Sequence, residues 1–240
     1  MPEAPQVGRV YLVGGGPGDP GLLTVRGKRV LEKADVVIYD YLVGEELLAH
    51  AEQAELIPAR DLHGNRAEQD RLNALLIDHA RQGKLVVRLK GGDPYLFGRG
   101  AEEGQALKAA GVPFEVVPGV TAALAVPAYA GIPVTHRDFA SAVAIFTGQV
   151  QATKDVDWRQ VGGHSTLVFM MAITNLPEVV KQLMAHGRAP DTPAAAIQWG
   201  TCPQQLTVTA KLRDFGTAVQ DAVLKSPAVV VVGDVVSLRD

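Results

Sequence analysis

One strand of this chain is joined to the following helix through two adjacent glycines. The apolar run Lys84–Leu89 predicts a buried strand, and the next helix is predicted to begin near Gly98. Between them, Gly91-Gly92 lets a ligand approach the backbone closely, and Pro94 stiffens the exit. Ligands of open α/β sheets bind at the carboxyl ends of strands. The segment therefore predicts an α/β fold with a ligand loop at this point.

A second loop of the same kind, Gly14–Pro20, follows the first predicted strand. It lacks the Gly-Lys-Ser/Thr of a P-loop, and Asp19 stands where a dinucleotide-binding loop has its third glycine. A carboxylate there would repel a pyrophosphate. Two interpretations stay open: a tight turn without a ligand, or a site for a neutral or cationic nucleoside.

Short apolar runs alternate with amphipathic stretches through the first half of the chain. Strands are predicted at Arg9–Val13, Val36–Tyr39, Glu55–Ile57, Lys84–Leu89 and Phe114–Val117, and helices at Leu22–Lys33, Gly44–Ala51, Ala67–Gln82 and Gly98–Ala110. Apolar strands that alternate with helices are typical of a parallel sheet covered on both faces. We therefore expect a parallel α/β domain.

The pattern changes after Pro118-Gly119. Strands are predicted at Val143–Thr147, Ser165–Met170, Ala194–Trp199, Gln205–Thr209 and Ala228–Val232, and helices at Leu176–His186 and Phe215–Val223. The runs 194–199 and 205–209 are typical of an antiparallel hairpin. We expect two α/β domains, residues 1–117 with a parallel sheet and 118–240 with a mixed sheet, and an active site in the cleft between them.

The composition is that of an ordinary globular protein, with 47% hydrophobic residues, 20% charged residues and a net charge of −3. This charge argues against a general nucleic-acid-binding surface. Cys202 is the single cysteine, which excludes an internal disulfide, and no histidines are paired at metal-ligand spacing, so we predict no metal site. No apolar run reaches the roughly 18 residues of a membrane span, and the N-terminus shows no signal-like segment. We expect a soluble, cytoplasmic protein.

Two carboxylates follow predicted strands, and each has two interpretations. Asp93 either accepts hydrogen bonds from ribose hydroxyls or an ammonium group, or caps the following helix. Asp40, at the end of the second strand, is either a proton acceptor or the start of a turn. Lys90 and Arg99 are interpreted as solvated or interdomain charges.

His136-Arg137-Asp138 forms a polar cluster near the predicted domain boundary. It is either an interdomain salt-bridge cluster or a site where the planar guanidinium of Arg137 binds a substrate carboxylate. Other cations that could face the cleft are Arg26, Lys28, Arg60, Arg88 and Arg99. Met170-Met171 ends an apolar strand and is either core packing or an apolar wall beside an adenine or a sulfonium methyl.

Five ordered segments together resemble the tetrapyrrole (corrin/porphyrin) methylase family, nearly from end to end. They are VYLVGGGPGDPGLLT (10–24), ADVVIYDYLV (34–43), VVRLKGGDPYLFGRG (86–100), FEVVPGVTAA (114–123) and AYAGIPVTHRD (128–138). The resemblance implies two α/β domains in a homodimer. It also implies methyl transfer from S-adenosylmethionine to carbons 2 and 7 of uroporphyrinogen III, giving precorrin-2, on the route to sirohaem and cobalamin.

The same resemblance assigns the site residue by residue. The implied cofactor pocket consists of Pro17, Gly91, Gly92, Asp93, Leu96, Thr121, Ala122, Met171 and Gly200, and the proton acceptor falls on Asp40. Cationic contacts to the substrate carboxylates are expected from Arg60, Arg99 and Arg137. The expected partner is thus a small tetrapyrrole, with neither nucleic acid nor membrane.

One segment departs from the family pattern. The family usually carries a lysine in a VGKR segment after the third strand, assigned as proton donor, whereas this chain places Arg60 or Asp61 in that slot. Arg60 can hold a propionate but is a poor proton donor at neutral pH. The proton donor is therefore left unassigned.

Two other functions stay open. One is a different methylase of the same fold, such as a later precorrin methyltransferase, diphthine synthase or a ribosomal RNA methyltransferase. The other is a non-enzymatic nucleotide-sensing module that uses the same glycine loops and predicts ligand binding without turnover.

Overall fold

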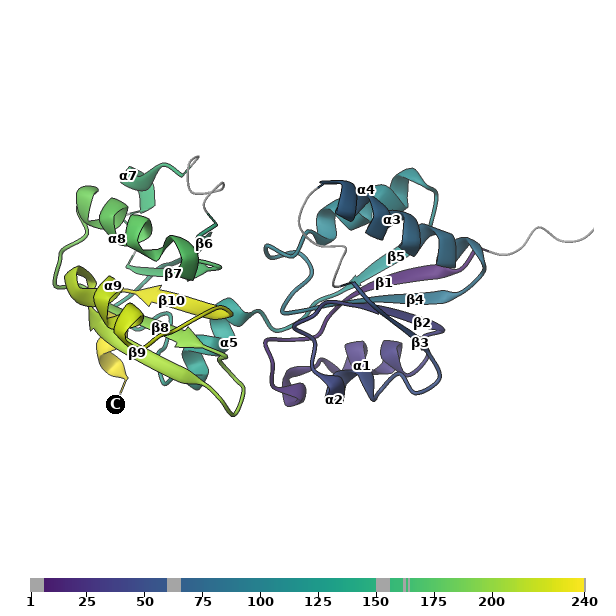
Figure 1. Cartoon of the computed structure of the whole chain (residues 1–240), viewed down its shortest axis with the longest axis horizontal. Helices are drawn as coiled ribbons and strands as arrows, with labels where there is room; N and C mark the ends of the chain where they lie inside the picture. The colour runs from purple at the N-terminus through teal and green to yellow at the C-terminus, as the bar shows by residue number, and fades with distance from the viewer. Residues whose placement is uncertain (1–6, 60–65, 150–155, 162, 164, 240) are drawn as a thin grey trace, which may run out of the picture. The chain divides into compact units, whose positions relative to one another are not determined.

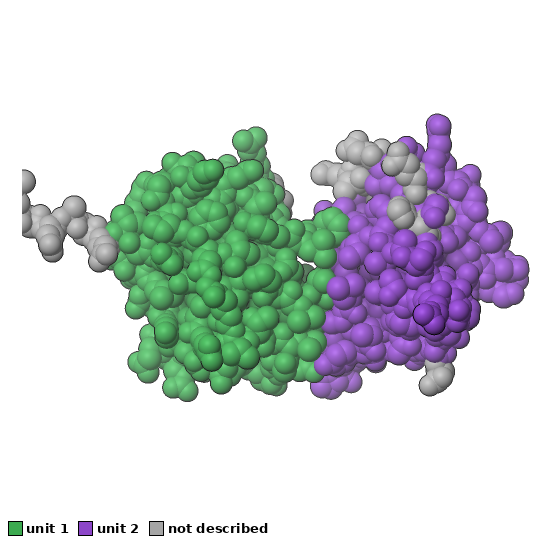
Figure 2. All heavy atoms as spheres, turned by 180° about the vertical axis from the view of Figure 1, so that it is seen from behind, with its two compact units in different colours: residues 1–121 green, residues 122–240 purple. Residues whose placement is uncertain are grey.

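The computed structural model describes residues 7–59, 66–149, 156–161, 163 and 165–239. The chain divides into two compact units, residues 1–121 and 122–240 (Figure 2). In its described parts, each unit contains one five-stranded sheet with helices packed on it (Figure 1). Among the described residues, no helix combines the length and the apolar character that crossing a membrane requires.

The sheet of the first unit is entirely parallel, as predicted. Its strands are β1 (Arg9–Gly14), β2 (Val36–Tyr39), β3 (Glu55–Pro58), β4 (Leu85–Lys90) and β5 (Phe114–Val117). They are ordered β3-β2-β4-β1-β5, and each neighbouring pair is parallel. All five strands therefore end at one edge of the sheet, which brings the loops after β1, β4 and β5 together.

Helices cover both faces of this sheet (Figure 1). They are α1 (Val25–Leu31) and α2 (Glu45–Leu48) on one face, and α3 (Arg66–Arg81) and α4 (Gly100–Ala109) on the other. Alternate strand residues point to opposite faces. Val86 therefore packs with Leu72 and Leu76 of α3, whereas Val87 packs with Leu31 of α1. The expected two-sided cover is confirmed.

Two helices begin later than predicted. The predicted helix 22–33 is replaced by a 3-10 turn, Pro20–Leu22, followed by α1, because Thr24 Oγ1 accepts a hydrogen bond from Gly27 N (3.1 Å) and caps α1. Helix α4 begins at Gly100 rather than near Gly98, because Arg99 is held at a left-handed φ of 59°.

The second unit contains the predicted mixed sheet. Its strands are β6 (Val143–Thr147), β7 (Thr166–Met170), β8 (Pro193–Gln198), β9 (Leu206–Lys211) and β10 (Ala228–Val232), ordered β6-β7-β10-β8-β9. Strands β6 and β7 are parallel, and the other pairs are antiparallel, including the predicted hairpin β8–β9. Because β7 and β8 are both antiparallel to β10, the strands β6, β7 and β8 end at the same edge.

The helices of the second unit also lie on both faces. Those on one face are α7 (Trp158–Val161), α8 (Leu176–Ala185), which the 3-10 turn Ile173–Asn175 precedes, and α9 (Leu212–Asp221). Helix α5 (Ala122–Tyr129) packs against β7 and β10, and the 3-10 segment Asp234–Leu238 packs against β8. Helices α5 and α7 were not predicted. Helix α5 contains Pro127, a residue that usually breaks a helix interior, and α7 is a single turn.

Candidate functional site

The two glycine loops that the sequence singled out are bonded to each other. Gly16 N donates a hydrogen bond to Gly92 O (3.2 Å), and Gly92 N donates one to Gly16 O (2.7 Å). Gly15 N also donates to Lys90 O (2.7 Å). The loops after β1 and β4 therefore form one backbone structure at the carboxyl edge of the parallel sheet.

A third loop, after β5, joins this structure through Gly119. A Cβ placed on Gly119 would lie 2.2 Å from Gly92 O and 2.7 Å from Gly14 Cα. Only glycine fits there. The backbones of all three loops are therefore in direct contact, without side chains between them. The sequence carries a signal for this third loop, because Gly119 also follows a predicted strand.

Asp93 connects the second loop to the third. Its Oδ1 accepts a hydrogen bond from Tyr95 N (2.8 Å), and its Oδ2 accepts one from Gly119 N (3.1 Å). It does not cap α4, which begins only at Gly100. An ionised carboxylate has about four acceptor positions, so Asp93 can hold the loops and still accept a hydrogen bond from a ligand.

The two glycine loops carry no basic side chain. Residues 14–24 and 91–98 contain neither lysine nor arginine, and each segment contains one aspartate. The exposed neighbours are instead apolar or aromatic, as at Tyr95 and Phe97. This chemistry does not fit a phosphate group, which is held by cations and free backbone N–H groups. It fits a neutral or cationic ligand.

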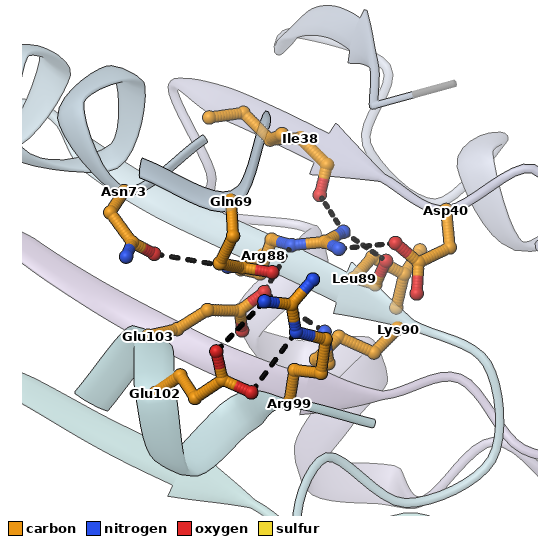
Figure 3. Close-up of polar contacts among 10 residues, drawn as sticks. All are labelled: Ile38, Asp40, Gln69, Asn73, Arg88, Leu89, Lys90, Arg99, Glu102 and Glu103. Atoms are coloured by element: carbon orange, nitrogen blue, oxygen red, sulfur yellow. Dashed lines mark hydrogen bonds and ion pairs between the residues drawn. The ribbon is translucent and has the colours of Figure 1, made fainter. Parts of the chain in front are cut away.

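A buried charge network lies at the same strand ends (Figure 3). Arg88, named among the cations that could face the cleft, is completely buried and faces no ligand. Its Nε donates to Glu103 Oε1 (3.1 Å), its Nη1 to the carbonyl oxygens of Ile38 (3.3 Å) and Leu89 (3.2 Å), and its Nη2 to Asp40 Oδ1.

Lys90 belongs to the same network. Its side chain is 2% exposed, so its interpretation as a solvated charge is wrong, and its Nζ donates to Glu103 Oε1 (2.9 Å). Burial lowers the pKa of Lys90 below 10.5, and nearby Arg88 lowers it further, while Glu103 and Asp40 act in the opposite direction. Lys90 is buried because, like Arg88, it points from β4 toward α4.

Sequence reasoning missed Glu103. It is fully buried on α4, four residues before the buried Leu107, whereas its neighbour Glu102 is exposed and pairs with Arg99. Because residues four apart share a helix face, the spacing to Leu107 was the available signal.

Asp40 connects the network to the surface. Its side chain is 19% exposed, its carboxylate pairs with Arg88, and its backbone N–H donates to Leu89 O (3.1 Å) at the end of β2. Arg99 also lies near this edge, and its Nε and Nη2 form a two-bond pair with Glu102 (3.0 and 2.8 Å). Pro17, Leu96 and Thr121 are half-buried in the loops after β1, β4 and β5.

Apart from Arg60, the remaining predicted site residues belong to the second unit. Met171 follows β7 and Gly200 follows β8, so both lie at the same edge of the mixed sheet. Gly200 packs against α5, the helix that begins at Ala122, because a Cβ at Gly200 would lie 2.3 Å from Val126 Cγ1. Arg137 is exposed in a tight turn closed by His136 and Ala140. Arg60 and Asp61 lie outside the described residues.

Positive φ angles, which strain the backbone of a non-glycine residue, are concentrated in the loops after β4, β7 and β8. Six non-glycine residues in the described parts of the chain have a positive φ: Phe97, Arg99, Met171, Trp199, Thr201 and Val223. All but Val223 lie in the loops after β4, β7 and β8. Such strain clusters at functional sites, where the surrounding structure holds it. Two predicted site residues, Arg99 and Met171, are among them.

The family model for tetrapyrrole (corrin/porphyrin) methylases matches residues 9–216. The chain belongs to this family. Siroheme synthase of Pseudomonas fluorescens is 50% identical over 243 residues, which cover 100% of this chain and 52% of that protein. The chain thus spans about half the length of this relative.

Two other relatives match this chain over nearly their whole length. An S-adenosyl-L-methionine-dependent uroporphyrinogen III methyltransferase of Methanosarcina barkeri is 46% identical, covering 97% of this chain and 94% of that protein. The crystal structure of uroporphyrin-III C-methyl transferase from Thermus thermophilus, complexed with S-adenosylhomocysteine, has a TM-score of 0.83 and 40% identity and covers 96% and 100% of the two chains. The predicted fold, two α/β domains of the methylase type, is confirmed.

We expect Gly119→Ala to destabilise the protein by about 1–3 kcal/mol, because the added methyl group overlaps the backbones of Gly92 and Gly14. Urea denaturation measures the change. Gly216→Ala is the control, since Gly216 lies inside α9 and, beyond its chain neighbours and the adjacent helix backbone, no described atom lies within 4 Å of an added Cβ. It should stabilise the protein by about 0.5–1 kcal/mol. Equal effects of the two substitutions would contradict the proposed loop contact.

We expect Lys90 to make stability rise with pH in the alkaline range. Its native pKa is lowered, so between that pKa and 10.5 the unfolded chain binds more protons than the native protein. The free energy of unfolding, measured relative to Lys90→Met, should therefore increase as pH rises toward 10.5. Lys28→Met, at an exposed lysine, is the matched control. A difference that falls with pH would show that the native pKa of Lys90 is raised rather than lowered.

Proposed function

We propose that this chain transfers methyl groups from S-adenosylmethionine to carbons 2 and 7 of uroporphyrinogen III, giving precorrin-2. Membership of the methylase family and the near full-length match to a uroporphyrinogen III methyltransferase support the reaction. The observation that carries the proposal is the joined pair of glycine loops. They present backbone groups and a carboxylate but no cation.

The loops suit the cofactor's chemistry. S-adenosylmethionine has ribose hydroxyls, an ammonium group and a sulfonium, but no phosphate. Apart from Gly91 itself and its chain neighbours, the only described atom within 4 Å of a Cβ added at Gly91 is Leu42 Cβ, at 3.8 Å, so a ligand can approach this backbone. Gly91, Gly92 and Pro17 would hold the cofactor by backbone contact, and Asp93 would accept hydrogen bonds from it. When bound, S-adenosylmethionine supplies an electrophilic methyl group.

Asp40 is the proposed proton acceptor. After a pyrrole carbon gains a methyl group, the tetrapyrrole must lose a proton, and a nearby carboxylate can take it. Asp40 has one oxygen paired with buried Arg88 and a side chain that reaches the surface. Its position is therefore set from inside the protein, while the substrate approaches from outside. The protein otherwise contributes by aligning the reactants.

The rest of the predicted site completes this proposal. Leu96, Thr121, Ala122, Met171 and Gly200 would line the cofactor pocket, and Arg60, Arg99 and Arg137 would meet the carboxylates of the substrate. Eight such carboxylates on one substrate explain why an acidic protein carries arginines at its site. We further propose that the enzyme acts in the cytoplasm as a homodimer, without nucleic acid or membrane.

Incubation with uroporphyrinogen III and S-adenosylmethionine should give a product that carries two added methyl groups by mass spectrometry. Asp40→Asn should lower kcat by about a hundredfold or more, because general base catalysis typically contributes that much. Methylation of a later precorrin but not of uroporphyrinogen III would assign a different methylase activity. Cofactor binding without turnover of any tetrapyrrole would favour a sensing module.

Asp93→Ala should weaken S-adenosylhomocysteine binding at least tenfold in calorimetry, because it removes a ligand acceptor and releases Gly119 N. Asp35→Ala is a matched control at the opposite edge of the same sheet, where Asp35 Oδ2 accepts a hydrogen bond from Leu85 N (2.7 Å). It should cost about 1 kcal/mol of stability and leave affinity within twofold. Unchanged affinity in Asp93→Ala would count against this cofactor site.

A further inference from the structure

Glu103 holds two buried cations on a single atom. Its Oε1 accepts from Arg88 Nε at 3.1 Å and from Lys90 Nζ at 2.9 Å, and the three side chains are 0%, 0% and 2% exposed. Its Oε2 is buried and has no hydrogen-bond partner among the described residues. Glu103 Oε2 is therefore available to accept a hydrogen bond from the remaining cation when Arg88 or Lys90 is replaced.

The network contains two cations, Arg88 and Lys90, and two carboxylates, Asp40 and Glu103 (Figure 3). Charges interact strongly in a poorly solvated interior. With Glu103 in place, Lys90 Nζ donates its hydrogen bond to Glu103, and Asp40 accepts one from Arg88 Nη2. Without the charge of Glu103, both cations would attract Asp40, the carboxylate that is left.

The guanidinium of Arg88 is a rigid plane, so its hydrogen bonds are geometrically linked. Glu103 fixes Nε, and the carbonyl oxygens of Ile38 and Leu89 fix Nη1. These three bonds set the direction in which Nη2 meets Asp40. A change at Glu103 therefore reaches Asp40 through Arg88, although Glu103 itself is fully buried.

We propose that Glu103 is a positioning residue for Asp40, which it acts on by neutralising Lys90 and orienting Arg88. Asp40 then keeps its carboxylate at the protein surface rather than turning inward. The inference rests on the proposed function, in which Asp40 accepts the substrate proton. Misplacement of such a group by about 1 Å can cost a hundredfold in rate.

A double-mutant cycle on Glu103 and Lys90 tests the proposal. Glu103→Gln removes the charge but keeps an oxygen for Arg88, and the amide nitrogen replaces the unpartnered Oε2. Lys90→Met leaves Glu103 free to bind Arg88 with both oxygens, which turns Arg88 away from Asp40. The double variant again has one buried cation facing one carboxylate. Glu178→Gln, at an exposed pair with Lys181, is the control for the chemical change.

We expect kcat to fall at least tenfold in each single variant and to return to within threefold of the wild type in the double variant. The KM for uroporphyrinogen III and the Kd for S-adenosylhomocysteine should stay within twofold throughout, and Glu178→Gln should match the wild type. If Glu103 and Lys90 only stabilised the fold, kcat per folded molecule would be unaltered in the single variants. Circular dichroism and thermal unfolding measure the fraction of each variant that is folded.

Single variants with kcat within twofold of the wild type would overturn the proposal. So would a double variant no more active than either single variant. If one single variant fails to fold, kcat of the other single variant is compared with kcat of the double variant. Recovery of kcat in the double variant supports the proposal, and no recovery overturns it. If the wild type does not methylate uroporphyrinogen III, the proposed function fails and this inference fails with it. Normal turnover without recovery in the double variant removes this inference alone.

Discussion

The proposed cofactor site depends on direct contact between the backbones of three loops. Strand β1 lies between β4 and β5, and all three run in parallel, so their loops leave the sheet side by side. Glycines at 14, 92 and 119 remove the side chains that would separate them. The hydrogen bonds between Gly16 and Gly92, and from Gly119 to Asp93, then fix the loops. A ligand therefore meets backbone groups whose geometry is already set.

The charges near this edge are divided between interior and surface. Arg88, Lys90 and Glu103 are buried, and the second positive charge is balanced by Asp40, which pairs with Arg88 and also reaches solvent. Breaking a buried pair usually destabilises a protein strongly, because a charge is left without a partner. The network thus gives the proposed proton acceptor a rigid support, and the glycine loops beside it stay free of cations.

Strands were predicted more accurately than helix ends. The predicted strands lie within two residues of the observed ends, and the central strands β2, β4, β8 and β10 are buried, largely apolar runs with little choice of residue type. Helix ends depend on local bonds, such as the cap of Thr24 on α1, and on the positive φ of Arg99 before α4. Helix α5 was missed because it contains Pro127 and has no polar face. Local pattern gives little warning of either effect.

The sequence by itself determined the fold class, the two glycine loops and the candidate Asp40, because each depends on residue type and order along the chain. Only the tertiary structure decided what the charged residues do. Lys90 and Arg88 look like surface cations in a strand that ends in a loop, yet the pleat of β4 turns both toward α4, where Glu103 meets them. Whether a charged side chain faces solvent or a buried partner depends on helices and strands that are distant in sequence. The residues next to that side chain do not indicate which of these elements will pack against it.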